Sequence, residues 1–275
     1  MTVAPERFQY VQQLVMERSA IVLSAEKAYL VDARLAPLAR DLGASNVNEV
    51  VDQVRSRKDP SLEQRVVEAL TTNETSWFRD SRPFQALERQ VFPELLRQNA
   101  TTRRLRVWSA ASSAGQELYS VAMLLEDKFP QLRAGWKVEL VGTDLNTEMV
   151  QRASEGLYST LEVNRGLPAS MLVRLFDKQG AHWRVKQSLR DRVSFSRINL
   201  AGPWPPMAPF DVVLLRNVLI YFDMKVKTEV LCRAVKQLAP GGYVLLGTAE
   251  SPNGLCPQLV PATTEGTVVY KVRRA

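Results

Sequence analysis

A run of small side chains, residues 109–115, separates a short apolar segment at 105–108 from a helical pattern that begins at Gln116. Small side chains let a ligand approach the backbone closely, and the first turn of the following helix offers N–H groups to an anion. The run contains one glycine, Gly115, whereas a bound pyrophosphate would require two or three. The pattern therefore favours a binding turn for a ligand without a pyrophosphate, although a turn that only packs tightly would have the same composition.

An acidic residue, Asp144, ends the next apolar segment at 140–143. A carboxylate in that position can accept hydrogen bonds from both hydroxyls of a ribose, which indicates a cofactor that contains adenosine. Asp144 can also cap the helix that follows, and the two roles can coexist. S-adenosylmethionine has no phosphate; its carboxylate suits a helix N-terminus, and its cationic amine and sulfonium suit carboxylates such as Glu117.

Alternating strands and helices must position these residues. Apolar runs of strand length lie at 105–108, 138–141, 212–215 and 243–246, and helical patterns lie at 116–128, 148–153 and 226–238. This alternation predicts an α/β fold with a doubly wound parallel sheet. A segment with period-two character interrupts the alternation between residues 160 and 198, which predicts a small antiparallel β insertion.

The N-terminal part of the chain has a helical pattern instead. We expect a small helical domain at 1–80, followed by a larger domain at 81–275 that contains the insertion. Candidate N-caps of the first helices are Ser24, Asn46 and Ser61.

The composition is that of a globular protein, with 45 % hydrophobic and 24 % charged residues among 275. No stretch approaches the roughly 18 consecutive apolar residues of a spanning helix, and no signal core follows the N-terminus, so we expect a cytoplasmic protein. Cys232 and Cys256 are too few for a disulfide framework and should stay reduced. The single histidine, His182, lies in a polar stretch without a motif, which argues against a metal site or a Ser-His-Asp triad.

The net charge of +7 is unevenly distributed. Residues 160–198 carry eight basic and three acidic side chains. Such a region can bind an acidic protein or a nucleic acid, or it can simply be a solvated surface.

Five short motifs follow one another along the chain. They are TTNETSWFRD at 71–80, WSAA at 108–111, GQE at 115–117, RNVLIYF at 216–222 and LAPGGY at 238–243. In this order they resemble the CheR family of chemoreceptor glutamate O-methyltransferases over nearly the whole chain. The resemblance implies a Rossmann-like class I methyltransferase sheet, S-adenosyl-L-methionine as cofactor and S-adenosyl-L-homocysteine as its product. It also implies that glutamate side chains of a chemoreceptor cytoplasmic domain are converted to methyl esters.

The same resemblance implies the residues of the site. Cofactor contacts are expected from Asn73, Thr75, Arg79, Glu117, Asp144, Asn199, Leu200, Arg216 and Asn217. The family positions that match Arg79 and Tyr221 lie near the transferred methyl group, so these two are the candidate catalytic residues. Alternatively, Arg79 only pairs locally and Tyr221 is mostly a core residue with a satisfied hydroxyl.

This chemistry requires no general base. A glutamate side chain has a pKa of about 4.3 and is already a nucleophile at neutral pH. The enzyme has to align the carboxylate with the methyl group and remove its water. We expect a loose contact from Arg79, because a tight bidentate pair would lower the nucleophilicity of the carboxylate.

By resemblance, the partner is the helical cytoplasmic bundle of a chemoreceptor, docked on the helical domain. Candidate contacts are Arg34, Arg40, Arg55, Arg57 and Lys58, which can equally form an ordinary solvated face. The loop at 177–182 is short, so we expect no binding of a receptor C-terminal peptide. We also expect a monomer that binds no nucleic acid and does not insert into a membrane.

Two other functions compete with glutamate methylation. One is a methyltransferase with a different acceptor, such as RNA, drawn to the basic region at 160–198. The other is a non-catalytic adaptor that binds the cofactor. The intact set of charged and amide side chains expected in the pocket argues against the adaptor.

Overall fold

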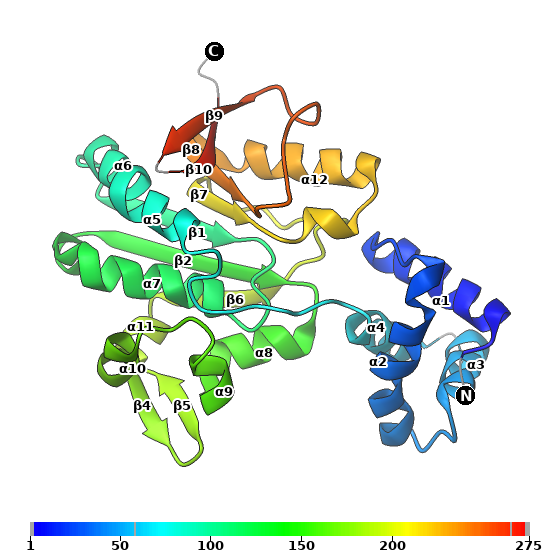
Figure 1. Cartoon of the computed structure of the whole chain (residues 1–275). Coiled ribbons are helices and arrows are strands. Elements are labelled where there is room, and N and C mark those ends of the chain that lie inside the picture. Colours follow the sequence, from blue (N-terminus) through cyan, green and yellow to red (C-terminus); the bar gives the residue numbers. More distant parts are fainter. Residues whose placement is uncertain (1–2, 58, 265, 273–275) are drawn as a thin grey trace.

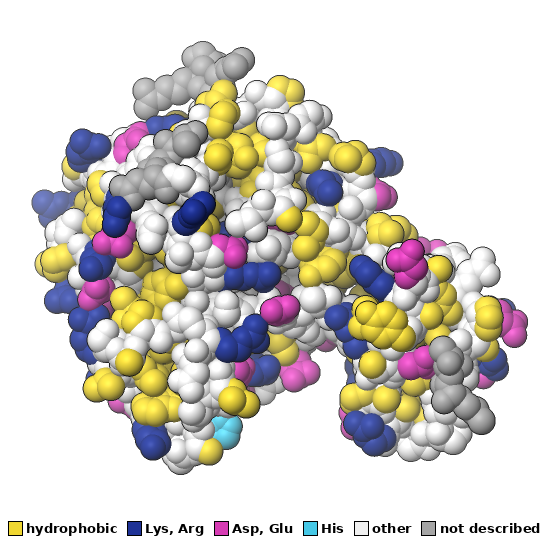
Figure 2. Space-filling model, in the orientation of Figure 1, with side chains coloured by type: hydrophobic (Ala, Val, Ile, Leu, Met, Phe, Trp, Pro, Cys, Tyr) yellow, Lys and Arg dark blue, Asp and Glu magenta, His cyan; other side chains and the backbone are white. Residues whose placement is uncertain are grey.

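The structure, a computed structural model, describes residues 3–57, 59–264 and 266–272 and has two lobes of unequal size (Figure 1). The small lobe is helical, and the larger lobe holds the described strands. Leu70 belongs to the core of the small lobe and Trp77 to that of the larger one, so the chain passes between the lobes over this segment. Figure 2 shows the two lobes with a notch between them.

Amphipathic helices build the small lobe. They are α1 (Pro5–Ser19), the 3₁₀ turn η1 (Ala25–Lys27), α2 (Ala28–Asp41), α3 (Val47–Arg57) and α4 (Pro60–Ala69). Their apolar faces meet in one core, where Val11, Val31, Leu35 and Val50 are fully buried. The predicted N-terminal helical domain is confirmed.

The helix starts agree only partly with the predicted caps. Asn46 caps α3 as predicted, since its side chain accepts a hydrogen bond from a first-turn N–H at 3.1 Å. The prediction for Ser61 is wrong, because α4 begins at Pro60 and Asp59 is its N-cap, accepting from the Ser61 N–H at 2.9 Å. Proline suits the first helical position because it has no N–H to satisfy. Ser24 precedes η1 but makes no side-chain cap bond there.

A seven-stranded sheet forms the centre of the larger lobe. Its strands are β1 (Arg104–Ser109), β2 (Lys137–Asp144), β6 (Val193–Arg197), β7 (Phe210–Leu215), β8 (Leu238–Leu246), β9 (Leu259–Thr264) and β10 (Thr267–Val272). The spatial order is β6-β2-β1-β7-β8-β10-β9. The first five strands pair in parallel, and β10 pairs antiparallel with both β8 and β9. Parallel pairing was predicted for β1, β2, β7 and β8, whereas β6 was expected in the antiparallel insertion. The sequence patterns did not predict this antiparallel end.

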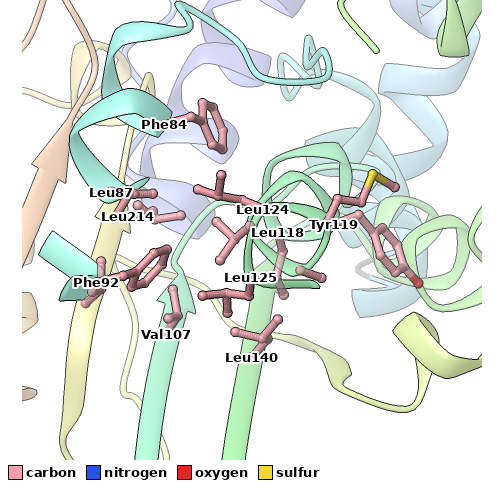
Figure 3. Close-up of a cluster of buried hydrophobic side chains, with 14 of the residues drawn as sticks. Phe84, Leu87, Phe92, Val107, Leu118, Tyr119, Leu124, Leu125, Leu140 and Leu214 are labelled. Atoms are coloured by element: carbon pink, nitrogen blue, oxygen red, sulfur yellow. The ribbon is translucent and has the colours of Figure 1, made fainter. Parts of the chain in front are cut away.

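Helices cover both faces of the sheet (Figure 1). They are α5 (Arg82–Ala86), the π-helix η2 (Leu87–Val91), α6 (Phe92–Gln98), α7 (Gln116–Lys128), η3 (Pro130–Arg133), α8 (Thr147–Glu155), η4 (Leu219–Tyr221) and α12 (Met224–Lys236). In β7, Val212 and Leu214 join the core that contains α7, whereas Val213 and Leu215 join the core that contains α12. Because successive strand side chains point to opposite faces, α7 and α12 lie on opposite faces. Figure 3 shows the first of these cores.

A small antiparallel sheet is inserted between β2 and β6, in the order β3-β5-β4. Its elements are β3 (Leu157–Ser159), α9 (Thr160–Val163), α10 (Ala169–Leu175), β4 (Phe176–Gln179), β5 (His182–Val185) and α11 (Gln187–Arg190). The bounds differ from the expected 160–198, because β3 starts earlier and β6 belongs to the main sheet. A period-two pattern predicts a strand but not the sheet that it joins.

No helix among the described residues combines the length and the apolar character that crossing a membrane requires.

Candidate active site

A cavity of about 850 Å³, including its solvent-open part, lies where β1, β2 and β7 end near the segment between the lobes. In α/β folds, ligands bind outside the carboxyl ends of the parallel strands. The cavity is lined by all ten residues predicted for the site, namely Asn73, Thr75, Arg79, Glu117, Asp144, Asn199, Leu200, Arg216, Asn217 and Tyr221. The fold thus brings together residues from five separate parts of the chain, and their individual roles stay predictions.

The turn after β1 has a backbone shape that depends on small residues. Ser113 and Gly115 have φ values of 48° and 91°, both in the left-handed region. A Cβ on Gly115 would lie 2.9 Å from the Cβ of Ala153 and 3.1 Å from the ring of Phe195, so only glycine fits. The Ser113 hydroxyl donates to the carbonyl of Asn73 at 2.7 Å, which fastens the segment between the lobes to this turn. α7 begins directly afterwards without a side-chain cap, and its N-terminus is open to an anion.

Asp144 ends β2 and is buried in the cavity wall. Its two carboxylate oxygens accept from the backbone N–H groups of Ser113 at 2.7 Å and Asn146 at 3.0 Å. Burial raises the pKa of Asp144 despite these bonds. The cap of α8 is Asn146, which accepts from the Met149 N–H at 3.2 Å, so Asp144 is not the N-cap. Each oxygen of Asp144 retains a lone pair, which can accept a ribose hydroxyl.

Arg216, at the end of β7, holds several parts of the site together. It is 5 % exposed and forms ion pairs with Glu117 at 2.7 Å and Asp80 at 2.8 Å. It also donates to the carbonyl of Arg79 at 2.9 Å, and Glu117 accepts a further bond from the Ser109 hydroxyl at 2.8 Å. A buried guanidinium needs such partners, and they fix the orientation of Glu117. Sequence reasoning missed Asp80, since nothing in its spacing pointed to Arg216.

The two candidate catalytic side chains approach the cavity from different segments. Arg79 follows the segment between the lobes, is half-buried and donates to the carbonyl of Glu74 at 3.1 Å. Tyr221 is the last residue of η4 and is also half-buried. Tyr221 is among the residues that line the cavity. The Tyr221 carbonyl accepts from the N–H of Val22 at 2.9 Å, which joins this segment to the small lobe.

The small lobe contributes to the cavity in a way that the sequence did not reveal. Ser19 and Ile21, at the end of α1, lie in its wall. The amide of Asn199 donates to the carbonyl of Arg18 at 2.7 Å, and its oxygen accepts from the N–H of Ala201 at 3.0 Å. Asn199 therefore uses its amide group to join the two lobes beside the predicted cofactor site. The pattern of α1 indicates only an amphipathic helix, so no local signal marked these residues.

The basic residues expected to meet a partner differ in their contacts. Arg34 donates to the carbonyls of Leu70 and Thr71 at 2.7 and 3.0 Å, so it anchors the segment between the lobes. Arg40, Arg55 and Arg57 are exposed. Lys58 lies outside the described residues.

The arrangement matches the chemistry of S-adenosylmethionine. A buried carboxylate at the end of β2 accepts a bond from a turn with one glycine, and Glu117, whose carboxylate is held by Ser109 and Arg216, lines the same cavity. These groups fit a ribose and a cationic amine, and the turn has no glycine-rich loop for a pyrophosphate. The fold and the residues that line the cavity are those expected of an S-adenosylmethionine-dependent methyltransferase.

Comparisons with known proteins narrow this class. Residues 6–71 match the CheR methyltransferase all-alpha domain, and residues 73–259 match the CheR methyltransferase SAM binding domain. The chain belongs to the CheR methyltransferase family. It is 39 % identical to chemotaxis protein methyltransferase 1 of Pseudomonas aeruginosa, over 99 % of this chain and 100 % of that protein. It is 38 % identical to chemotaxis protein methyltransferase Cher2 of Pseudomonas putida, over 97 % of this chain and 98 % of that protein.

Among solved structures, the chain is similar to the N-methyltransferase NodS of Bradyrhizobium japonicum in complex with S-adenosyl-L-homocysteine. The alignment covers 72 % of this chain and 92 % of that chain, at 17 % identity and a TM-score of 0.38.

Proposed function

We propose that this chain is a cytoplasmic enzyme that transfers the methyl group of S-adenosylmethionine to glutamate side chains of a chemoreceptor cytoplasmic domain. The product is a glutamate methyl ester that serves chemotaxis adaptation or a related receptor pathway. The observation that carries the proposal is that Arg79 and Tyr221 line the same cavity as the predicted cofactor residues Glu117 and Asp144. The names of the two Pseudomonas relatives support the chemotactic context.

The chain supplies placement rather than proton transfer in this reaction. Bound S-adenosylmethionine supplies a methyl group on a sulfonium leaving group. Asp144 would hold the ribose of the bound cofactor, and Glu117, fixed by Arg216, would balance its cationic amine. The acceptor glutamate arrives ionised, because its ordinary pKa of about 4.3 lies well below neutral pH. The cavity walls remove its water and align it with the methyl group.

Arg79 orients the incoming carboxylate. One of its Nη atoms donates to the carbonyl of Glu74, and the other N–H groups of the guanidinium stay available. Because the side chain is half-buried in a segment without regular secondary structure, the contact it makes is loose. A loose contact positions the carboxylate and leaves its lone pair reactive. Tyr221 orients the acceptor or the cofactor from the opposite segment.

The receptor bundle docks on the small lobe through its exposed basic residues. Arg40, Arg55 and Arg57 are exposed and can meet the acidic, glutamate-rich surface of such a bundle. Arg34 has a structural role instead, since its donors hold the segment that leads to Arg79. The protein acts as a monomer.

RNA is a less suitable acceptor, because much of the basic region at 160–198 is neutralised within the chain. Ion pairs join Arg165 to Glu74, Arg174 to Asp127, Arg192 to Glu126 and Arg197 to Glu68. Arginines that are paired in this way release fewer counterions from a phosphate backbone. Figure 2 shows basic and acidic side chains interspersed on the face in view.

Transfer of a radiolabelled methyl group from S-adenosylmethionine to a purified receptor cytoplasmic fragment tests the proposal. A carboxyl methyl ester is labile to base, so an alkaline wash must release the label. Arg79→Ala should lower the transfer rate by about 100-fold, because a misplaced acceptor loses alignment. Binding of S-adenosylhomocysteine should fall much less.

The matched control is Arg165→Ala. Arg165 lies beside the same segment, and its side chain forms an exposed ion pair with Glu74 at 3.1 Å, whereas its bond to Trp77 uses the backbone carbonyl and survives the substitution. Such pairs contribute little, so this variant should keep the wild-type rate. A label that is stable to base would contradict the proposed acceptor. Equal rates in the two variants would contradict the role of Arg79.

A further inference from the structure

One carboxylate outside the cavity collects an unusual number of backbone donors. Glu250 follows β8, and its side chain accepts from five N–H groups. The donors are Gly247 at 2.7 Å, Asn217 at 2.8 Å, Val218 at 2.9 Å, Leu219 at 2.7 Å and Ile220 at 3.3 Å. Four of these donors are consecutive: Asn217 and Val218 precede η4, and Leu219 and Ile220 are its first two residues. The motif RNVLIYF therefore has its central backbone bound to a residue that lies 30 positions further along the chain.

This arrangement imposes a particular shape on the segment. Four consecutive N–H groups converge on one side chain only if the backbone turns sharply, and Asn217 has a φ of 56° in the left-handed region. The donors from Val218 onward lie at the N-terminus of η4, where a negative charge is favoured. Without Glu250 these N–H groups would lose their acceptor, and the loss costs most at the half-buried Val218 and the buried Leu219, because Ile220 is exposed.

The fit around the carboxylate is tight. A Cβ on Gly247 would lie 2.7 Å from Oε2 of Glu250 and 2.8 Å from Nδ2 of Asn217. The glycine thus leaves room for both the carboxylate and the Asn217 amide. Asn217 and Tyr221, at the two ends of the bound segment, both line the cavity, whereas Glu250 does not.

We infer that Glu250 is a positioning residue for methyl transfer, which acts by fixing Asn217 against the cofactor and Tyr221 against the reacting groups. The effect of Glu250 on Tyr221 rests on the proposed function, whereas its effect on Asn217 concerns cofactor binding alone. A carboxylate is required because all five partners are donors. Glutamine has the same length, but its NH₂ group is a donor and would replace one of the two accepting oxygens that face the N–H groups.

The full-length Glu250→Gln variant tests the inference. Calorimetry with S-adenosylhomocysteine should show affinity reduced about fivefold or more, because the Asn217 wall of the cavity shifts. At saturating S-adenosylmethionine, kcat for methyl transfer should fall by about 10- to 100-fold, since a displacement near 1 Å can cost about 100-fold. Affinity reports on the position of Asn217, and kcat reports on the position of Tyr221.

Glu94→Gln is the matched control. Glu94 is also a half-buried glutamate, and its carboxylate accepts from the Tyr243 hydroxyl at 2.5 Å and forms an ion pair with Lys271, away from the cavity. Its loss should lower the melting temperature but leave cofactor affinity and kcat within about twofold of wild type. Equal effects of the two variants on affinity and kcat would overturn the positioning role and reduce Glu250 to a stabilising contact.

A double-mutant cycle with Tyr221→Phe completes the test. If Glu250 acts through Tyr221, the combined loss in kcat is smaller than the product of the single losses. Fully multiplicative losses would overturn that coupling. Gly247→Ala, which displaces the carboxylate without removing it, should reproduce the pattern and serves if Glu250→Gln does not fold. A wild-type chain that methylates no receptor would refute the proposed acceptor, whereas the affinity measurement would still decide the role of Glu250.

Discussion

The substitution Asp144→Asn isolates the carboxylate that we expect to bind the ribose. The side chain keeps its size, but one of its two oxygens becomes an NH₂ group. Because one oxygen accepts from Ser113 and the other from Asn146, the new NH₂ must face a backbone donor in either orientation. The remaining oxygen loses its charge and keeps only one backbone donor.

The expected loss in cofactor affinity follows from these contacts. Two hydroxyl bonds to a carboxylate contribute about 1.5 kcal/mol each, so a loss of about 2 to 3 kcal/mol is expected. That corresponds to a dissociation constant about 30 to 140 times larger for S-adenosylhomocysteine. The free energy of unfolding should change less than the free energy of cofactor binding does. Burial raises the pKa of Asp144 above its unfolded value, so the ionised group destabilises the fold at neutral pH, and asparagine removes that penalty.

Isothermal titration calorimetry at neutral pH, with thermal unfolding in parallel, measures both quantities. Asp211→Asn is the matched control. Asp211 is also buried and accepts from the N–H of Arg106 at 2.7 Å and the amide of Asn99 at 2.9 Å, but it does not line the cavity. This variant should lose stability by about 1 to 3 kcal/mol and keep its affinity.

The pH dependence provides a second, independent reading. Protonated Asp144 cannot accept both hydroxyls, and its raised pKa brings protonation to a higher pH than that of an ordinary aspartate. Wild-type affinity should therefore fall as the pH is lowered, beginning at a higher pH than an ordinary aspartate would give, whereas Asp144→Asn should show no such dependence. A folded Asp144→Asn protein that binds within about threefold of wild type would refute the ribose assignment.

Two further substitutions test the structure of the site. Gly115→Ala should lower the free energy of unfolding, measured in urea, by about 1 to 3 kcal/mol. The reason is that φ of Gly115 is 91° and the new Cβ would lie 2.9 Å from the Cβ of Ala153. Unchanged stability would mean that the turn can relax. Arg216→Met should lower the free energy of unfolding by about 3 kcal/mol or more, because Glu117 and Asp80 lose the buried partner that they share. Cofactor affinity should fall as well. A stable variant with normal affinity would show that Ser109 alone orients Glu117.

The parallel strands and the long helices of the larger lobe were predictable because their signals are local. The helical pattern at 116–128 is α7, and the apolar runs at 105–108 and 212–215 lie within β1 and β7. Buried parallel strands are continuous apolar runs, and a helix repeats its apolar positions every three to four residues. The antiparallel pair β9 and β10 has only short, mixed patterns and was not predicted.

The resemblance carried by the motifs pointed to ten residues, and all ten line one cavity. What each residue does within that cavity depends on contacts between distant segments. The cap of α8 falls on Asn146 and not on Asp144, because only one of the two has its backbone at the helix start.

By itself, the sequence determined the α/β architecture, the helical lobe and the residues that gather at the strand ends. Only the tertiary structure decided that Arg216 binds Glu117 and Asp80, that α1 closes one side of the cavity and that Glu250 holds the segment leading to Tyr221. The physical reason is that residue periodicity reports which face of an element is apolar, whereas buried charges find their partners wherever the folded backbone places a complementary group.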